Sequence, residues 1–133
     1  MVIVDTTALI DYLAGTPSPQ AEWLEREMTT RRLGLLDLMV CEVLQGVGND
    51  RQATAVLAGL KRFEIFDTGG VDLAVAAAAN YRLLRARGRT VRKTIDTVIA
   101  TFCIRGGHAL LHNDKDFDAF EEHLRLQVVR PDA

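Results

Sequence analysis

The sequence predicts a single α/β domain in which helices flank both faces of a central, mostly parallel five-stranded sheet. Short apolar runs alternate along the chain with stretches of helical periodicity, which is the pattern of α/β folds. The segments between these runs are long enough for the crossover connections that parallel strands require, about a dozen residues. With 133 residues, 48% of them hydrophobic, the chain can build one sizeable core and leaves little room for another. We therefore expect one domain over residues 1–133.

The first half of the chain is predicted to contain two strands and four helices. A β-branched run favours a strand at the N-terminus, after which Leu9, Ile10 and Leu13 follow helical spacing until Gly15. Pro19 occupies a favoured place near the first turn of an amphipathic helix. In order, we predict a strand at 1–4, helices at 6–15 and 19–32, a strand at 33–36, a helix capped by Asp37, and a helix from about 50.

The second half is predicted to contain the other three strands. An alanine-rich segment and the apolar stretch that begins at Thr94 both favour helices, and each ends at glycine. In order, we predict a strand at 63–66, a helix at 71–87, a helix at 94–107, a strand at 109–112, a helix at 114–123 and a strand at 126–129.

Charge and cysteine content exclude several classes of protein. Sixteen Lys and Arg residues against eighteen Asp and Glu residues give a formal charge of −2, so any binding of nucleic acid must be local. Cys41 and Cys103 both lie in apolar stretches, which argues against a disulfide framework and for a cytoplasmic protein. No apolar run approaches the roughly 18 residues of a membrane span, so no membrane partner is expected.

Two acidic residues lie at or just after the ends of predicted strands. Asp5 ends the first apolar run, and Asp114 follows the run ALLH, with Asp116 two residues later. The carboxyl ends of parallel strands meet at one edge of a sheet, where open α/β folds bind ligands. Taken alone, Asp5 or Asp114 is equally well explained as a helix cap, which contributes about 1 kcal/mol.

Two further acids lie within apolar helical stretches. Glu42 is part of MVCEVL, and Asp96 follows Ile95 in the first turn of an apolar helix. Each has an alternative explanation, because Glu42 can face solvent on an amphipathic helix and Asp96 is favourable near a helix N-terminus.

Convergence of these acids would point to a metal ion. Two carboxylates about 4 Å apart repel by roughly 4 kcal/mol at an effective dielectric near 20. A cluster of four must therefore take up protons or hold a cation. Oxygen ligands select hard ions, Mg²⁺ or Mn²⁺, and no Cys/His cluster has zinc spacing. Such ions support hydrolysis of phosphodiesters.

The segments VDTTALIDYL, EVLQG and RARGRTVRKTIDTVIATFCIRGGHALLHNDKDF, in this order and spacing, resemble the PIN domain. In its single-domain size the chain resembles the VapC ribonuclease toxins of bacterial type II toxin–antitoxin systems. The resemblance covers nearly the whole chain and implies a PIN-like sandwich in which the strands ending in Asp5 and Asp114 are neighbours. It also implies endonucleolytic cleavage of RNA that depends on Mg²⁺ or Mn²⁺.

The resemblance assigns roles to particular residues. It makes Asp5, Glu42, Asp96 and Asp114 the metal site and Asp116 a further ligand, and the hydroxyl of Thr6 would support this site. It implies a cognate VapB-type antitoxin whose C-terminal segment blocks the site, and a homodimer within a larger assembly. His112 departs from the family, since relatives often have a hydroxyl residue two positions before the first Asp. It is either a water-mediated neighbour of the metal or an inert strand residue.

Two surfaces are candidates for binding. Six cations and no acid lie between Arg82 and Lys93, and we predict that this basic rim binds RNA, chiefly through Arg87, Arg89, Arg92 and Lys93. A solvated helix end explains the same pattern. Tyr81 is the one aromatic residue there, so base stacking is not indicated. An apolar groove for a partner helix is the second candidate, although core packing explains its residues equally well: Leu9, Ile10, Tyr12, Trp23, Leu24 and Met28.

Two other functions compete with a nuclease. A phosphotransfer enzyme that is phosphorylated on Asp5 would resemble haloacid-dehalogenase-like phosphatases, which need a second Asp two residues later, but Thr7 is found there. A catalytically silent PIN-like binding module would keep the basic rim and the groove but lose acidic residues. None of the four acids is missing here, which favours the nuclease.

Overall fold

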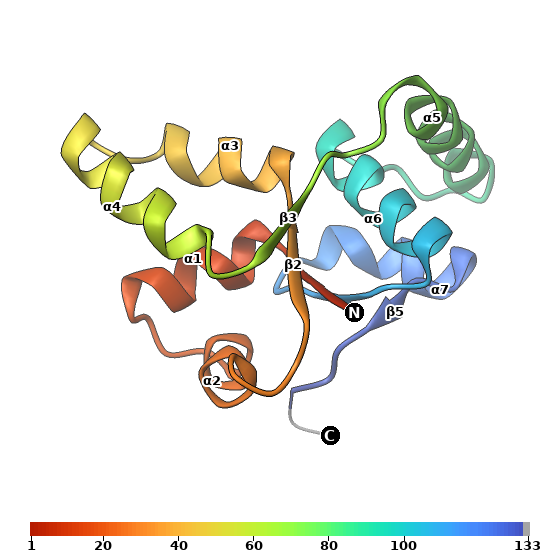
Figure 1. Ribbon diagram of the computed structural model, residues 1–133. Helices are drawn as coiled ribbons and strands as arrows, with labels where there is room; N and C mark the ends of the chain where they lie inside the picture. The colour runs from red at the N-terminus through yellow and green to blue at the C-terminus, as the bar shows by residue number, and fades with distance from the viewer. Residues whose placement is uncertain (132–133) are drawn as a thin grey trace.

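The computed structural model describes residues 1–131, which form one five-stranded sheet flanked by helices (Figure 1). All strand pairs are parallel, and the strand order is β3-β2-β1-β4-β5. The strands are β1 (Val2–Val4), β2 (Leu33–Leu36), β3 (Glu64–Phe66), β4 (Ala109–Leu111) and β5 (Gln127–Val128). The predicted α/β class and the five strands are confirmed.

Seven α-helices and one 3₁₀ helix connect the strands of the part that the structure describes. They are α1 (Thr6–Ala14), α2 (Pro19–Glu27), α3 (Asp37–Gln45), α4 (Asp50–Leu60), α5 (Gly70–Ala86), α6 (Thr94–Gly106), η1 (Lys115–Phe117) and α7 (Asp118–Leu124). In Figure 1, α3 and α4 lie on one side of the upper part of the molecule and α5 and α6 on the other.

Helix boundaries differ from the predictions at three places. Helix α2 ends at Glu27 and not near residue 32, and the hydroxyl of Thr30 donates to the Glu27 carboxylate at 3.0 Å in the turn that follows. Leu36 takes the N-cap position of α3, so Asp37 is the first helical residue and not the cap. The predicted helix at 114–123 begins as a 3₁₀ turn, because the Asp114 side chain accepts from the amide of Asp116 at 2.9 Å.

The direction of winding reverses between β1 and β4. The chain passes from β1 to β2 and β3 on one side, and β4 then pairs on the other side of β1, with Val4 opposite Leu111. The amide of Asp5 extends this pairing by donating to the carbonyl of Leu111 at 2.9 Å. In open α/β sheets such a reversal opens a crevice at the carboxyl ends of the strands. The predicted placement of Asp5 and Asp114 beside it follows from this topology.

The core lies between the sheet and the helices. Its largest fully buried side chains are Ile3, Leu9, Leu24, Leu35, Leu36, Met39, Leu60, Leu84, Ile99, Leu110, Phe117 and Phe120. Gly34 in β2 packs closely against side chains, because a Cβ atom there would lie 2.7 Å from Met1 Sδ and 2.9 Å from the Phe66 ring, so a larger residue would displace them. Within residues 1–131, no helix is long and apolar enough to cross a membrane.

The apolar groove expected on the first two helices is mostly core. Leu9, Trp23 and Leu24 are buried, whereas Ile10 and Leu13 are exposed. These two residues line a hollow of about 630 Å³ that lies between α1, α3 and α4. The prediction of an exposed apolar surface therefore holds for α1 but not for α2, whose apolar residues Trp23 and Leu24 are buried. The other wall of the hollow is formed by α3 and α4.

Candidate metal centre

Asp5 is held at the end of β1 by the residue two positions later. The Asp5 carboxylate accepts from the Thr7 amide at 3.1 Å and from the Thr7 hydroxyl at 2.6 Å, so it also caps α1. The side chain is 3% exposed. Burial raises the pKa of Asp5, although the bonds from Thr7 oppose this shift. The helix cap therefore accounts for one Asp5 oxygen, Oδ2, which accepts both bonds from Thr7.

Thr7 also joins the two strand ends. Its hydroxyl accepts from the amide of Asn113 at 3.0 Å while it donates to Asp5 Oδ2. This one oxygen therefore links the carboxylate that follows β1 to the turn that follows β4. Sequence reasoning assigned a supporting hydroxyl to Thr6 and missed Thr7. A hydroxyl two residues after a strand-ending Asp, where it can bond back within a turn, was the available signal.

Asp114 and Asp116 lie in the turn after β4. Asp114 is the N-cap of η1, and the amide of Asp114 donates to Nδ1 of His112 at 3.1 Å. His112 is 8% exposed and packs against the Phe117 ring, with 4.9 Å between centroids. Since Nδ1 accepts, Nε2 carries the proton of the neutral ring, and burial lowers the pKa of His112. The ring therefore fixes the backbone of the Asp114 turn.

Asp96 faces the same point from the first turn of α6. One carboxylate oxygen each from Asp96, Asp114 and Asp116 lie within 4.8 Å of one another. Asp96 is 4% exposed, and its Oδ2 has no hydrogen-bond partner among the described residues. A buried carboxyl oxygen without a partner is costly in either protonation state, so stability alone does not explain this arrangement.

Glu42 approaches from α3 and is half-buried. Its Oε1 accepts from the hydroxyl of Thr6 at 2.8 Å, and its charge contributes to the raised pKa of Asp5. The carboxylate thus faces the first strand end, and the alternative of a fully solvated side chain does not describe it. Thr6 contacts the acidic group through Glu42.

Like charges perturb the titration of this cluster. Burial, together with the charges of Asp5, Asp114 and Asp116, raises the pKa of Asp96 to about 7, while Lys93 opposes the shift. The five predicted acids are therefore brought to one edge of the sheet, with three forming the tightest group. Their oxygen-only donor set and the unpartnered Asp96 oxygen fit a hard divalent cation such as Mg²⁺.

The predicted basic rim separates into three parts. Arg92 pairs with Asp116 at 3.3 Å and Lys93 approaches Asp114 at 3.8 Å, so these two cations partly neutralise the acidic cluster. Arg89 forms an ion pair with Glu122 of α7. Arg87 is exposed at the end of α5. Three of the four residues are therefore paired with carboxylates, and Arg87 has no ion pair among the described residues.

Comparisons with known proteins identify the family of the chain. A family model described as the PIN domain matches residues 2–122. The chain is 32% identical over 134 aligned residues to VapC ribonuclease Mb1587 of Mycobacterium bovis, with 97% of this chain and 98% of the relative covered. Ribonuclease VapC11 of Mycobacterium tuberculosis matches with the same identity and coverage.

Solved structures share the fold at lower identity. VapBC-1 from nontypeable Haemophilus influenzae aligns with a TM-score of 0.76 and 16% identity over 100% of both chains. A toxin–antitoxin complex from Klebsiella pneumoniae aligns with a TM-score of 0.74 and 22% identity over 98% of both chains. Because the family model spans most of the chain and the mycobacterial relatives match nearly all of it, this protein belongs to the PIN-domain family and, within that family, to the VapC ribonucleases.

Proposed function

We propose that this protein is an endoribonuclease that depends on Mg²⁺ or Mn²⁺ and uses Asp5, Glu42, Asp96, Asp114 and Asp116. The observation that supports this proposal most strongly is the group of carboxylate oxygens from Asp96, Asp114 and Asp116 within 4.8 Å, one of which comes from a buried and partly unsatisfied side chain. The names of the mycobacterial relatives, both ribonucleases, indicate RNA as the substrate class.

The residues of this chain have distinct tasks in the proposed reaction. Asp96, Asp114 and Asp116 would hold the divalent ion. When bound, the ion would lower the pKa of a water molecule and neutralise charge that develops on the phosphate. Thr7 orients the Asp5 carboxylate, and Thr6 orients Glu42. Arg92 and Lys93 pair with Asp116 and Asp114, and we propose that they would contact a phosphate once the ion neutralises those acids.

The proposed regulation is by a protein partner. Structural neighbours of this chain were solved as toxin–antitoxin complexes, and we propose a VapB-type antitoxin as the cognate inhibitor. Ile10, 48% exposed, and Leu13 line the hollow between α1, α3 and α4, and Glu42 borders the same hollow. An apolar helix bound there would lie beside the acidic site. Copurification with the product of a neighbouring reading frame, together with loss of cleavage, tests this proposal.

Cleavage of a fluorophore-labelled structured RNA tests the enzymatic proposal. We expect cleavage with Mg²⁺ or Mn²⁺ and none with EDTA, and we expect Asp96→Asn to lower the rate by more than the 10- to 100-fold that loss of a supporting residue typically causes. The matched control is Glu25→Gln, which removes one exposed carboxylate charge on α2. Cleavage in EDTA, or full activity of Asp96→Asn, would contradict the proposal.

A binding module without catalytic activity is the competing outcome. Titration of Mn²⁺ by calorimetry separates the two, because it reports on the acidic group without requiring turnover. Binding of Mn²⁺ that is lost in Asp96→Asn, accompanied by metal-dependent cleavage, supports the nuclease. If the wild-type protein binds both Mn²⁺ and RNA but does not cleave the RNA, the result would favour a binding module without catalytic activity.

A further inference from the structure

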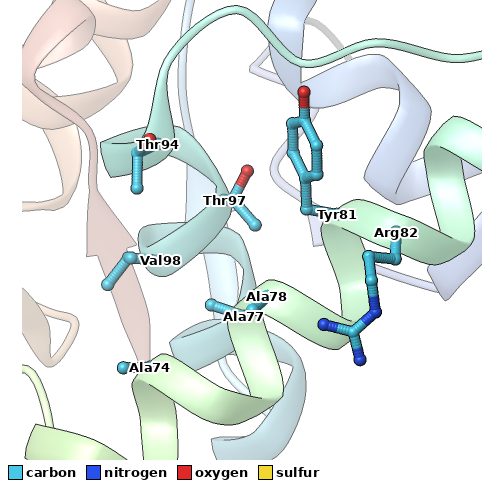
Figure 2. A pocket seen from close by; sticks show the side chains of 8 residues that line it. All are labelled: Ala74, Ala77, Ala78, Tyr81, Arg82, Thr94, Thr97 and Val98. Atoms are coloured by element: carbon cyan, nitrogen blue, oxygen red, sulfur yellow. The ribbon is translucent and has the colours of Figure 1, made fainter.

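A cavity of about 320 Å³ lies between α5 and α6 (Figure 2). Three alanines of α5, Ala74, Ala77 and Ala78, form one wall, and the ring of Tyr81 stands at its end. Thr94 and Thr97 of α6 form the other wall and flank Asp96 in the chain. The cavity and the acidic group therefore share the first turn of α6, and the volume is at the lower end of the range for small-ligand sites.

Thr97 is a polar side chain that the fold leaves without a partner. It is 2% exposed, and its hydroxyl has no hydrogen bond within residues 1–131. Figure 2 shows its side chain turned toward the ring of Tyr81. Thr101, one turn further along α6, is equally buried but accepts from Asn80 Nδ2 at 3.0 Å. An unpaired buried hydroxyl is destabilising, so packing alone does not account for a threonine at position 97.

The charges around the cavity favour an anionic ligand. Arg82 lines the cavity, and the guanidinium of Arg85 lies 5.8 Å from the centre of the Tyr81 ring. In the described part of the chain, no carboxylate is within ion-pairing distance of Arg82, Arg85 or Arg87. Two of these three unpaired cations therefore belong to the cavity's surroundings, Arg82 in its lining and Arg85 against the Tyr81 ring.

We propose that this cavity is a subsite for one unstacked nucleotide of the RNA substrate. The base would pack between the alanine wall and the Tyr81 ring, the Thr97 hydroxyl would bond to the base edge, and Arg82 would contact a phosphate. Single-stranded RNA is recognised in this way, by apolar or aromatic contact with a splayed base and by cations along the backbone. The inference rests on the proposed ribonuclease function and adds a recognition site to it.

Filling the cavity tests the subsite. Ala78 and Ala79 are both exposed on α5, but only Ala78 lines the cavity, so Ala78→Leu and Ala79→Leu form a matched pair. Binding is measured by fluorescence anisotropy with a labelled single-stranded RNA oligonucleotide, in an Asp96→Asn background to prevent cleavage. We expect about tenfold weaker binding for Ala78→Leu, as for loss of one base contact, and no change for Ala79→Leu.

Thr97→Val separates a ligand contact from a structural role. The substitution keeps the shape and removes the unpaired hydroxyl, so thermal unfolding should occur at the same or a higher temperature. We expect an increased KM for RNA cleavage with this variant, with kcat little changed. A purely structural Thr97 would leave KM unchanged, and that result would overturn its assignment as a base contact.

Three results would distinguish failure of the subsite from failure of the enzyme. If the wild-type protein does not cleave RNA, the proposed function itself fails. If it cleaves RNA and Ala78→Leu binds and cleaves like Ala79→Leu, the subsite is wrong and the function stands. If Ala78→Leu changes the oligomeric state in light scattering while Ala79→Leu does not, the cavity belongs to an interface between two copies, which also overturns the subsite.

Discussion

The two edges of the sheet treat charge in opposite ways. At the amino edge, Arg32 precedes β2 and pairs with Glu64 of β3 through two bonds of 2.9 and 2.6 Å, and both side chains are exposed. At the carboxyl edge, Asp5 and Asp96 are buried beside other carboxylates. Charged side chains in proteins are usually exposed or paired with an opposite charge, as they are at the amino edge. At the carboxyl edge they are instead buried beside like charges. The edge that costs stability is the one proposed to hold the metal ion.

The largest expected effect is on the pH dependence of stability at the carboxyl edge. The pKa of Asp96 is raised from 3.8 to about 7, so its contribution to metal-free stability is present below pH 3.8 and is lost as pH rises through about 7. This shift corresponds to about 4 kcal/mol. In EDTA, Asp96→Asn should therefore be more stable than wild type at about pH 8 by up to that amount, and similar to it near pH 4. Urea unfolding at both pH values measures the difference in free energy of unfolding between Asp96→Asn and wild type. If this difference is the same at pH 4 and pH 8, Asp96 does not destabilise the carboxyl edge by its charge.

Loss of the Thr7 hydroxyl should have the next largest effect. Thr7→Val removes the donor to Asp5 and the acceptor for the Asn113 amide, so the two strand ends lose their link. Supporting residues of this kind change metal affinity or activity by about 10- to 100-fold. Mn²⁺ calorimetry and cleavage rates should both show this loss. Thr29→Val, at an exposed position after α2, is the control, and equal behaviour of the two variants would refute the role of Thr7.

Substitution of His112 should slow cleavage by a smaller factor. The loss should come from removing Nδ1, which accepts from the Asp114 amide, and not from removing the aromatic ring. His112→Phe keeps an aromatic ring against Phe117 but leaves the Asp114 amide unpaired, and we expect about tenfold slower cleavage. His112→Asn can accept from the same amide in an Asx turn and should restore most of the rate. If His112→Phe cleaves RNA like wild type, His112, which follows β4, does not support the Asp114 turn.

The smallest effect is expected at the amino edge. Arg32→Gln breaks the exposed pair with Glu64, and such pairs contribute little to stability. The unfolding temperature should change by no more than about 3 °C, and cleavage should not change. A loss of activity in Arg32→Gln would show that the two edges are not functionally distinct.

Most of the fold was predictable because local patterns and topology agreed. The five apolar runs became five parallel strands, and the reversal between β1 and β4 explains why acids separated by more than one hundred residues, such as Asp5 and Asp114, lie at one edge. The end of α2 was not predictable from its apolar spacing, since the hydroxyl of Thr30 competes for bonds near Glu27. The spacing of apolar residues does not report such local side-chain hydrogen bonds, so it does not predict where they end a helix.

The supporting parts of the site were harder to predict than its acids. Carboxylates in apolar contexts are conspicuous in sequence, whereas the role of Thr7 depends on the turn of a distant strand. The sequence shows the cluster of cations between Arg82 and Lys93, but it does not show which acids pair with them. Glu122 and Asp116 reach Arg89 and Arg92 only through the packing of the folded chain. The cavity between α5 and α6 likewise depends on how two helices meet and not on either helix alone.

Diffraction from crystals soaked in Mn²⁺ tests the central claim most directly. We predict an anomalous peak in contact with the carboxylates of Asp96, Asp114 and Asp116, with Arg92 and Lys93 withdrawn from their present pairs. Absence of a peak at this edge of the sheet in crystals saturated with Mn²⁺, with both ion pairs intact, would contradict the assignment of these buried acids as a metal site.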